Sequence, residues 1–324
     1  MLRRTLLVAG LAAAAAARAQ PGPPQASWPQ RPVRVLVGFP PGGLTDVLAR
    51  VLAPRLSGRF GQPFVVENRT GASGIIAAEA VANATDGHTL LLAHPTALAI
   101  APVFARRLPF DAERALAYVS LLALQPHLLL VKADAPWRDV AALVADARAR
   151  PETITFASSG VGSVQHIQAE QFCAATGVRM VHVPYRGSAP TMTDLAAGQV
   201  DWVIDGVGVS RPLIEAGRLR ALATANDRRL ARYPDLPTLA ELGIAGVLPG
   251  SWFGLAGPAS LPGLVVWALS EAAAAALLAP EVARALDNAS AEGIGGGPDE
   301  FRAFVRDQIA RFRELAKTAS IGME

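Results

Sequence analysis

Apolar residues along the chain alternate between short runs rich in valine and leucine and longer stretches in which they recur every three or four positions. Residues 33–39 and 64–67 have the first pattern, which is typical of buried strands, and residues 47–56 have the second, which is typical of a helix. A further helix over 71–84 and a strand over 89–93 complete a strand–helix–strand–helix–strand order. This order predicts a parallel sheet with helices on both faces.

The same order begins again near residue 128. Two such units suit the length of the chain, and we expect two lobes, with crossings between them near 120–130 and 220–226. The first lobe is expected to comprise 28–124 plus 226–324 and the second 125–225, with C-terminal helices over 262–278 and 299–318 returning to the first. In the second lobe, strands are predicted at 128–131, 154–158, 180–185, 200–205 and 219–225, and helices at 137–150, 164–176 and 190–197.

The N-terminus has the three parts of a secretory signal peptide. Arg3 and Arg4 supply positive charge, residues 6–17 are apolar but too short to span a bilayer, and Ala17-Arg18-Ala19 fits a cleavage site. A signal peptide is thus predicted at 1–19, a flexible leader at 20–27, and the mature chain in the periplasm. Export by the general secretory or the twin-arginine route stays open.

Removal of the signal peptide changes the charge balance. The full chain has 30 Lys+Arg and 27 Asp+Glu, and the loss of Arg3, Arg4 and Arg18 leaves 27 of each. A neutral mature chain does not favour nucleic acid or an anionic membrane surface as a partner. No later stretch reaches about 18 uncharged apolar residues, and the single cysteine, Cys173, is far from the cleavage site. We therefore expect a soluble monomer without a lipid anchor, with Cys173 in its core.

Three short, glycine-rich loops each follow a predicted strand and precede a predicted helix. They cover residues 40–46, 71–74 and 158–163. Free backbone N–H groups and the helix dipole make such positions favourable for an anion, and glycine lets a ligand approach the backbone. The alternative for each loop is an ordinary turn with a helix cap. Because the first and third loops belong to different lobes, we expect them to face each other across a cleft.

The sequence does not favour several other chemistries. It contains no Gly-Lys-Ser/Thr phosphate loop, no complete dinucleotide fingerprint after Gly160, and no Gly-x-Ser-x-Gly nucleophile motif. We therefore expect no cofactor and no metal. His166 could line the cleft or serve a structural role. No metal-binding spacing occurs among the histidines, which are His88, His94, His127, His166 and His182.

A set of motifs occurs in a fixed order along nearly all of the mature chain. Together they resemble the Bug family, the TctC-like periplasmic solute-binding components of tripartite tricarboxylate transporters. The motifs are Trp28-Pro29-x-x-Pro32-Val33, Gly38-Phe39-Pro40-x-Gly42-Gly43-x-Thr45-Asp46, Gly61-Gln62-x-x-Val65-Val66-Glu67-Asn68-Arg69, Asp86-Gly87-His88-Thr89-Leu90, His182-Val183-Pro184-Tyr185-Arg186-Gly187 and Asp235-x-Pro237-Thr238.

The resemblance implies an α/β type II periplasmic-binding-protein fold, in which two Rossmann-like lobes enclose a ligand cleft. Family members hold a ligand carboxylate largely through backbone groups and ordered waters. The segments 94–96 and 206–208 depart from the family pattern, and Asp46, Asp205 and Arg186 each have an alternative reading as a cap or a surface charge. Carried over, the ligand-binding residues are Phe39, Gly42, Gly43, Thr45, Asp46, Thr96, Ser158, Gly162, Ser163, Tyr185, Gly187, Ala189 and Asp205.

We therefore predict a non-enzymatic periplasmic receptor that captures a small carboxylate for a tripartite tricarboxylate transporter. The ligand could be a di- or tricarboxylate, an acidic amino acid or an aromatic acid. The expected partners are the membrane components of that transporter. Two alternatives stay open: a receptor that signals to a sensor protein, and a secreted α/β hydrolase.

Overall fold

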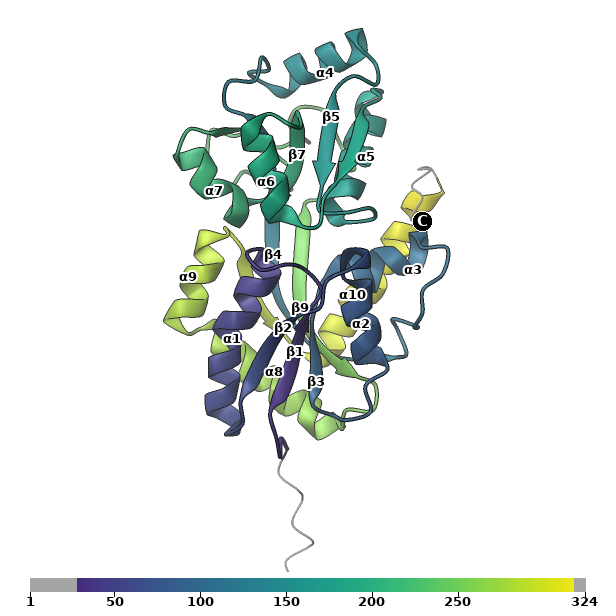
Figure 1. Cartoon of the computed structure of the whole chain (residues 1–324), viewed down its shortest axis with the longest axis vertical. Helices are drawn as coiled ribbons and strands as arrows, with labels where there is room; N and C mark the ends of the chain where they lie inside the picture. Colours follow the sequence, from purple (N-terminus) through teal and green to yellow (C-terminus); the bar gives the residue numbers. More distant parts are fainter. Residues whose placement is uncertain (1–27, 318–324) are drawn as a thin grey trace, which may run out of the picture.

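The computed structural model describes residues 28–317, and the predicted signal peptide and leader lie outside these residues. Two lobes lie one above the other in Figure 1. Strand β4 (Leu116–Lys132) runs from the lower lobe into the upper one, and β9 (Gly250–Pro258) pairs antiparallel beside its first half. The long strand β4 therefore belongs to the sheets of both lobes.

The first lobe contains a mixed sheet in the order β2-β1-β3-β9-β4, with β10 (Glu292–Gly296) also on β4. Strands β1 (Val33–Val37), β2 (Phe64–Asn68) and β3 (Thr89–Ala93) are parallel, as expected. Side chains of β1 alternate between two cores, since Val33, Val35 and Val37 pack on one face and Leu36 on the other.

Helices cover both faces of this sheet. One core is built with α1 (Leu44–Phe60), α8 (Gly263–Leu277) and α9 (Pro280–Asn288), and the other with α2 (Ile75–Ala82), α3 (Ala101–Phe104) and α10 (Pro298–Ala316). Two short helical segments, η1 (Ala72–Gly74) and η2 (Thr96–Ile100), precede α2 and α3. Helices α8 and α10, which correspond to the helices predicted at 262–278 and 299–318, pack against the first half of β4 and the cores of this sheet.

The second lobe contains the other half of β4. Its strands are ordered β8-β4-β7-β5-β6, in which β5 (Thr155–Ser158) is parallel to both β6 (Val181–Pro184) and β7 (Trp202–Gly206). Cys173 is buried in its core, as predicted. Its remaining strand is β8 (Leu219–Thr224), and its helices are α4 (Val140–Ala149), α5 (Val164–Thr176), α6 (Ser188–Ala197) and α7 (Val207–Glu215).

The chain returns to the first lobe later than the sequence indicates. Strand β8 stays in the second lobe beside β4, and a bridge joins Thr224 to Thr238. Leu239 and Ile244 then pack in the core of the second lobe. Strand β9 is therefore the second crossover, in place of 220–226, and we propose the division 28–124 plus 250–317 for the first lobe and 125–249 for the second.

The two crossing strands meet closely where they leave the second lobe. Gln125 pairs with Ser251, and Pro126 with Gly250. A Cβ atom at Gly250 would overlap the backbone of Gln125, so only glycine fits this position without a shift. The hinge between the lobes is thus a narrow pair of strands.

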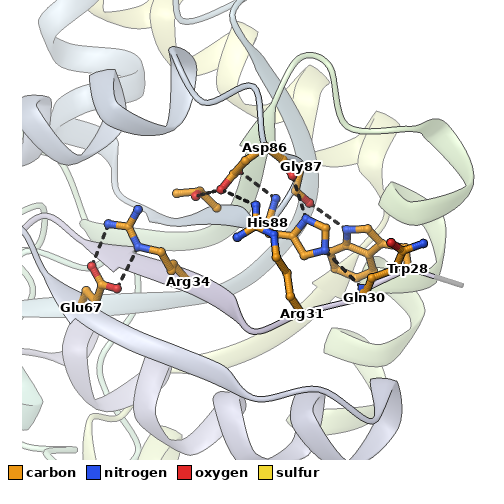
Figure 2. Close-up of polar contacts among 9 residues, drawn as sticks. Trp28, Gln30, Arg31, Arg34, Glu67, Asp86, Gly87 and His88 are labelled. Atoms are coloured by element: carbon orange, nitrogen blue, oxygen red, sulfur yellow. Dashed lines mark hydrogen bonds and ion pairs between the residues drawn. The ribbon is translucent and has the colours of Figure 1, made fainter. Parts of the chain in front are cut away.

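The first described residues lie at the far end of the first lobe, away from the hinge (Figure 1), and Figure 2 shows the polar contacts that hold them there. Trp28 Nε1 donates to the carbonyl oxygen of Gly87 over 2.7 Å, and the Trp28 ring lies edge-on to Phe60. Arg31 pairs with Asp86 nearby, and Arg34 forms two bonds of 2.8 Å to Glu67 across β1 and β2. The first described segment of the chain is therefore fixed on the sheet.

No single helix among residues 28–317 has the length and apolar composition needed to cross a membrane. The bent pair α8 and α9, which meet at 73°, passes that test only when the two are counted together.

Candidate ligand-binding site

A cavity of about 50 Å³ lies between the two lobes beside the hinge. It adjoins a groove of about 530 Å³ with which it shares Phe39, Pro40 and Ser159. The wall combines both lobes and the crossing strands. Its residues are Phe39, Pro40, Pro41, Gly43, Leu44, Thr45, His94 and Phe253 from the first lobe, Ser159, Gln165, Gly187, Ser188, Ala189, Asp205, Gly206 and Val209 from the second, and Gln125, His127 and Ser251 from the hinge.

Three helices begin at this cavity with no side-chain cap. The N-cap residues are Gly43 for α1, Gly187 for α6 and Gly206 for α7, and all three line the wall. The first N–H groups of a helix have no partner inside the helix, and the dipole makes this end positive. One such end comes from the first lobe and two from the second. The cavity is therefore favourable for a negative group held between the lobes.

Asp46 fixes the loop that leads into α1. Its carboxylate accepts hydrogen bonds from Arg50 Nε at 3.0 Å, Asn68 Nδ2 at 2.8 Å and the backbone N–H of Gly42 at 3.3 Å. Asn68 also donates to the carbonyl oxygen of Phe39. Burial alone would raise the pKa of Asp46, but these hydrogen bonds outweigh it and lower the pKa. Asp46 is thus an ionised residue that positions Phe39 and Gly42.

His94 is a neutral part of the wall. Burial and, to a lesser extent, the neighbouring His127 lower the pKa of His94 to about 3. The backbone N–H of Thr96 donates to its Nδ1, and the Thr96 hydroxyl lies 3.2 Å from the same atom. Nδ1 is then an acceptor, so Nε2 carries the proton in the neutral ring. His94 therefore offers a hydrogen-bond donor, held in place by Thr96.

In His127 the proton lies on the other ring nitrogen, Nδ1. Gln168 Nε2 donates to the carbonyl oxygen of Leu248, which leaves Gln168 Oε1 to accept from His127 Nδ1 at 2.8 Å. Burial lowers the pKa of His127, although Asp205 and Gln168 act to raise it. The ring is neutral with its proton on Nδ1, so Nε2 is an acceptor.

Three polar side chains of the wall have no hydrogen-bond partner among the described residues. They are Thr45, Gln125 and Ser251, which come from α1 and from the paired strands of the hinge. None of the described lining residues is a lysine or an arginine. An anion in this cavity would thus meet neutral donors and helix ends rather than a cation, and the one acidic side chain among the described lining residues is Asp205.

Six of the predicted ligand-binding residues line the cavity: Phe39, Gly43, Thr45, Gly187, Ala189 and Asp205. Gly42 and Asp46 belong to the loop beneath it, and Thr96 supports His94. Their direct contact with a ligand stays a prediction.

The loop 158–163 shares the adjoining groove with loop 40–46, since Ser159, Gly160 and Val161 line that groove together with Pro40, but it contributes little to the cavity itself. Ser163 caps α5 by accepting from His166 N, and Gly162 N donates to His166 Nδ1. Only Ser159 of this loop lines the cavity. The first turn of α6 takes its place, since a Cβ at Gly187 would come within 3.1 Å of Pro40. His166 therefore has a structural role in capping.

Ser158 and Tyr185 also lie outside the cavity wall. Ser158 Oγ lies 2.7 Å from His182 Nε2, and the Tyr185 hydroxyl donates to Asp194. His182 stacks on His166 with ring centroids 3.9 Å apart, and burial together with His166 lowers the pKa of His182 to about 4. Tyr185 and Arg186 instead line the adjoining groove between the lobes.

Several wall residues had no signal in the sequence. Gln125, His127 and Ser251 lie on strands whose pairing brings them together, and Gln165 and His94 match no motif that singles them out. The segment 206–208, expected as an atypical loop, is the start of α7 and adds a third helix end. No group of three or more potential metal ligands occurs within residues 28–317.

The family of the chain follows from its match to a family model. The model described as "Tripartite tricarboxylate transporter family receptor" (TctC) matches residues 48–321. The chain belongs to this family of solute-binding receptors. The TctC assignment confirms the resemblance noted in the sequence.

Solved structures of similar proteins share the TctC fold over nearly the whole chain. The periplasmic binding protein BugD is 31% identical with a TM-score of 0.86, covering 92% of this chain and 100% of its own. The R. palustris protein Rpa4515 with adipate is 40% identical with a TM-score of 0.86, covering 91% and 99%. MatC from Rhodopseudomonas palustris with bound malate is 30% identical with a TM-score of 0.84, covering 89% and 99%. The predicted type II periplasmic-binding-protein fold is confirmed.

Proposed function

We propose that the mature chain is a periplasmic receptor that captures a small carboxylate between its lobes and delivers it to the membrane components of a tripartite tricarboxylate transporter. The observation that carries this proposal is the meeting of three uncapped helix ends, at Gly43, Gly187 and Gly206, in one cavity between the lobes. Backbone N–H groups and helix dipoles stabilise an anion there without a fixed cation.

The similar structures support a carboxylate as the ligand class. Rpa4515 was solved with adipate and MatC with malate, which are dicarboxylates of different length. The neutral donor of His94 and the hydroxyl of Thr45 suit carboxylate oxygens. Periplasmic location rests on the signal peptide predicted at 1–19 and on the family.

A thermal-shift screen of the mature protein tests the proposal. Dicarboxylates, hydroxy acids, acidic amino acids and aromatic acids are compared with their neutral amides at one concentration. A ligand at 100 times its Kd adds about 2.7 kcal/mol of stability, which is a clear rise in Tm. If no carboxylate raises Tm, or the amides raise it equally, the proposal fails.

Because Ser158 and His182 lie within hydrogen-bond distance, hydrolase activity should be tested as an alternative to the receptor function. We propose that it is not catalytic, because Ser158 is fully buried and the low pKa of His182 makes it a weak base. Hydrolysis of simple esters that disappears in Ser158→Ala would contradict this, whereas unchanged carboxylate binding in the same variant supports the receptor role.

A further inference from the structure

Asp205 forms a buried, half-satisfied part of the cavity wall. It lies at the end of β7, and its side chain is 2% exposed. Its Oδ1 atom accepts from Gln165 Nε2 at 2.9 Å and from the backbone N–H of Gly206 at 2.7 Å. Its Oδ2 atom is buried and has no donor within residues 28–317. A buried acceptor without a donor costs about 1–3 kcal/mol, and more when it is charged.

The Asp205 carboxylate is held so that it cannot exchange its two oxygens freely. Gln165 fixes it, because Gln165 Oε1 accepts from Ser159 Oγ at 2.8 Å while Nε2 also reaches Ser188 Oγ at 3.3 Å. These partners set which end of the Gln165 amide faces Asp205. Gln165, Ser159 and Ser188 all line the same cavity. Oδ2 is thus a rigid acceptor whose missing partner is not supplied by a rotation of Asp205.

His127 does not supply the missing donor. Its proton lies on Nδ1, where Gln168 accepts it, so Nε2 of the neutral ring is a second acceptor in the wall. The described lining residues include no arginine or lysine, and none of their neutral donors, such as the amide of Gln125 or the hydroxyl of Ser188, bonds to Asp205 Oδ2. A donor for Asp205 would therefore come from the ligand.

We propose that the preferred ligand carries, besides its carboxylate, a hydroxyl or ammonium group that donates to Asp205 Oδ2. This deepens the proposed function and rests on it, since the carboxylate is assigned to the helix ends at Gly43, Gly187 and Gly206. A plain dicarboxylate brings only acceptors and a second negative charge toward Asp205. The site therefore selects hydroxy- or amino-carboxylates against their unsubstituted parents.

Titration calorimetry with matched acids tests this. Succinate, malate and aspartate share one carbon skeleton and differ at one carbon by H, OH or NH₃⁺, and glutarate, 2-hydroxyglutarate and glutamate form the same series one carbon longer. Both enantiomers of each substituted acid are used. We expect a substituted acid to bind at least tenfold tighter than its parent, because a hydrogen bond to a charged group contributes about 1.5–3 kcal/mol. The hydroxy and amino arms show which donor is preferred.

The variant Asp205→Asn sharpens the test. Gln165 and Gly206 both donate toward the Oδ1 position, so the amide oxygen of the variant stays there and its NH₂ group takes the place of Oδ2. The acceptor becomes a donor, and the preference for the substituted acid falls to about threefold or less, or reverses. Asp201→Asn is the matched control, because Asp201 lies just before the same strand and its hydrogen bonds within residues 28–317 all join it to Thr155. We expect this variant to keep the wild-type ratio.

The outcomes separate this inference from the function on which it rests. Equal affinity of the wild-type protein for the parent and substituted acids overturns the role of Asp205 but leaves a carboxylate receptor. An unchanged ratio in Asp205→Asn overturns it as well. Failure of all six acids to bind overturns the proposed function together with the inference. If melting curves show that a variant does not fold, the ratio of affinities for substituted and parent acids in the wild-type protein still tests the role of Asp205.

Discussion

The hydroxyl of Ser73 in the first lobe donates a hydrogen bond of 2.9 Å to the carbonyl oxygen of Val161 in the second. Ser73 has a φ of 51°, a left-handed conformation that is uncommon for a residue other than glycine. A Cβ atom on the neighbouring Gly160 would lie 2.6 Å from the Ser73 hydroxyl. The lobes are therefore in specific contact across the groove that leads to the cavity.

Loss of this contact should speed ligand release. We expect Ser73→Ala to raise the dissociation rate of the tightest-binding carboxylate about two- to tenfold, because a neutral hydrogen bond contributes about 0.5–1.5 kcal/mol. The association rate should change little, since the bond forms only when the lobes meet. Stopped-flow measurement decides, with Thr153→Ala in the second lobe as a control. An unchanged dissociation rate would show that the contact does not hold the lobes together.

Closure should also depend on the small size of Gly187. Ala at this position would place a Cβ atom 3.1 Å from Pro40 of the other lobe, in addition to the strain of a φ of 115°. We expect Gly187→Ala to weaken carboxylate binding at least tenfold. Gly177→Ala is the control, because Gly177 also has a positive φ, of 68°, but nothing lies within 4 Å of the added atom. Calorimetry beside melting curves compares them, and equal losses of affinity would contradict a role in closure.

Ligand capture should change the shape of the molecule. The cavity wall is shared between the lobes, which are joined by strands β4 and β9, so binding should shift the population toward the closed form. Small-angle X-ray scattering should give a smaller radius of gyration with a bound carboxylate than without it. An identical radius in both samples would mean that the lobes do not close on the ligand.

The buried His94 and the half-buried His182 should make the protein less stable in acid. The pKa of His94 is about 3 and that of His182 about 4 in the folded chain, against about 6.5 when unfolded. Between these values the unfolded chain binds more protons, so the free energy of unfolding falls as the pH drops from about 6.5 to 4, by up to about 1.4 kcal/mol per pH unit for each histidine. Urea midpoints of wild type and His182→Gln measure this. The variant should show the weaker pH dependence, and equal slopes would contradict the assignment.

Much of the first sheet could be predicted because its strands are regular in sequence. The runs around Val35, Phe64 and Leu91 are continuous and apolar, and each is followed by a helical pattern. Strand β9 could not be predicted, since Gly250, Gly254 and Gly257 interrupt its apolar residues. The structure gives a steric reason for each of them, because a Cβ atom would overlap the backbone of Gln125 at Gly250, the ring of Phe301 at Gly254 and the side chain of Leu261 at Gly257. Glycine in this strand makes room for packing rather than for a turn.

The candidate site could be predicted only where a local motif marks it. Gly43 and Gly187 each stand directly before a helix, and both were predicted as ligand-binding residues. The conformation of loop 158–163 instead depends on hydrogen bonds of Gly162 and Ser163 with His166, which no local motif indicates. Gln125 and Ser251 face the same cavity because β4 pairs with β9 at that point. That pairing joins residues far apart in the chain, and no local pattern records it.

In the proposed function, helix ends from both lobes hold the negative charge of a carboxylate. Titration calorimetry of the mature protein with the tightest-binding carboxylate and with its neutral amide tests this most directly. We expect at least a tenfold weaker affinity for the amide, because charge-assisted hydrogen bonds contribute about 1.5–3 kcal/mol each. Equal affinities for the acid and the amide would contradict anion capture at Gly43, Gly187 and Gly206.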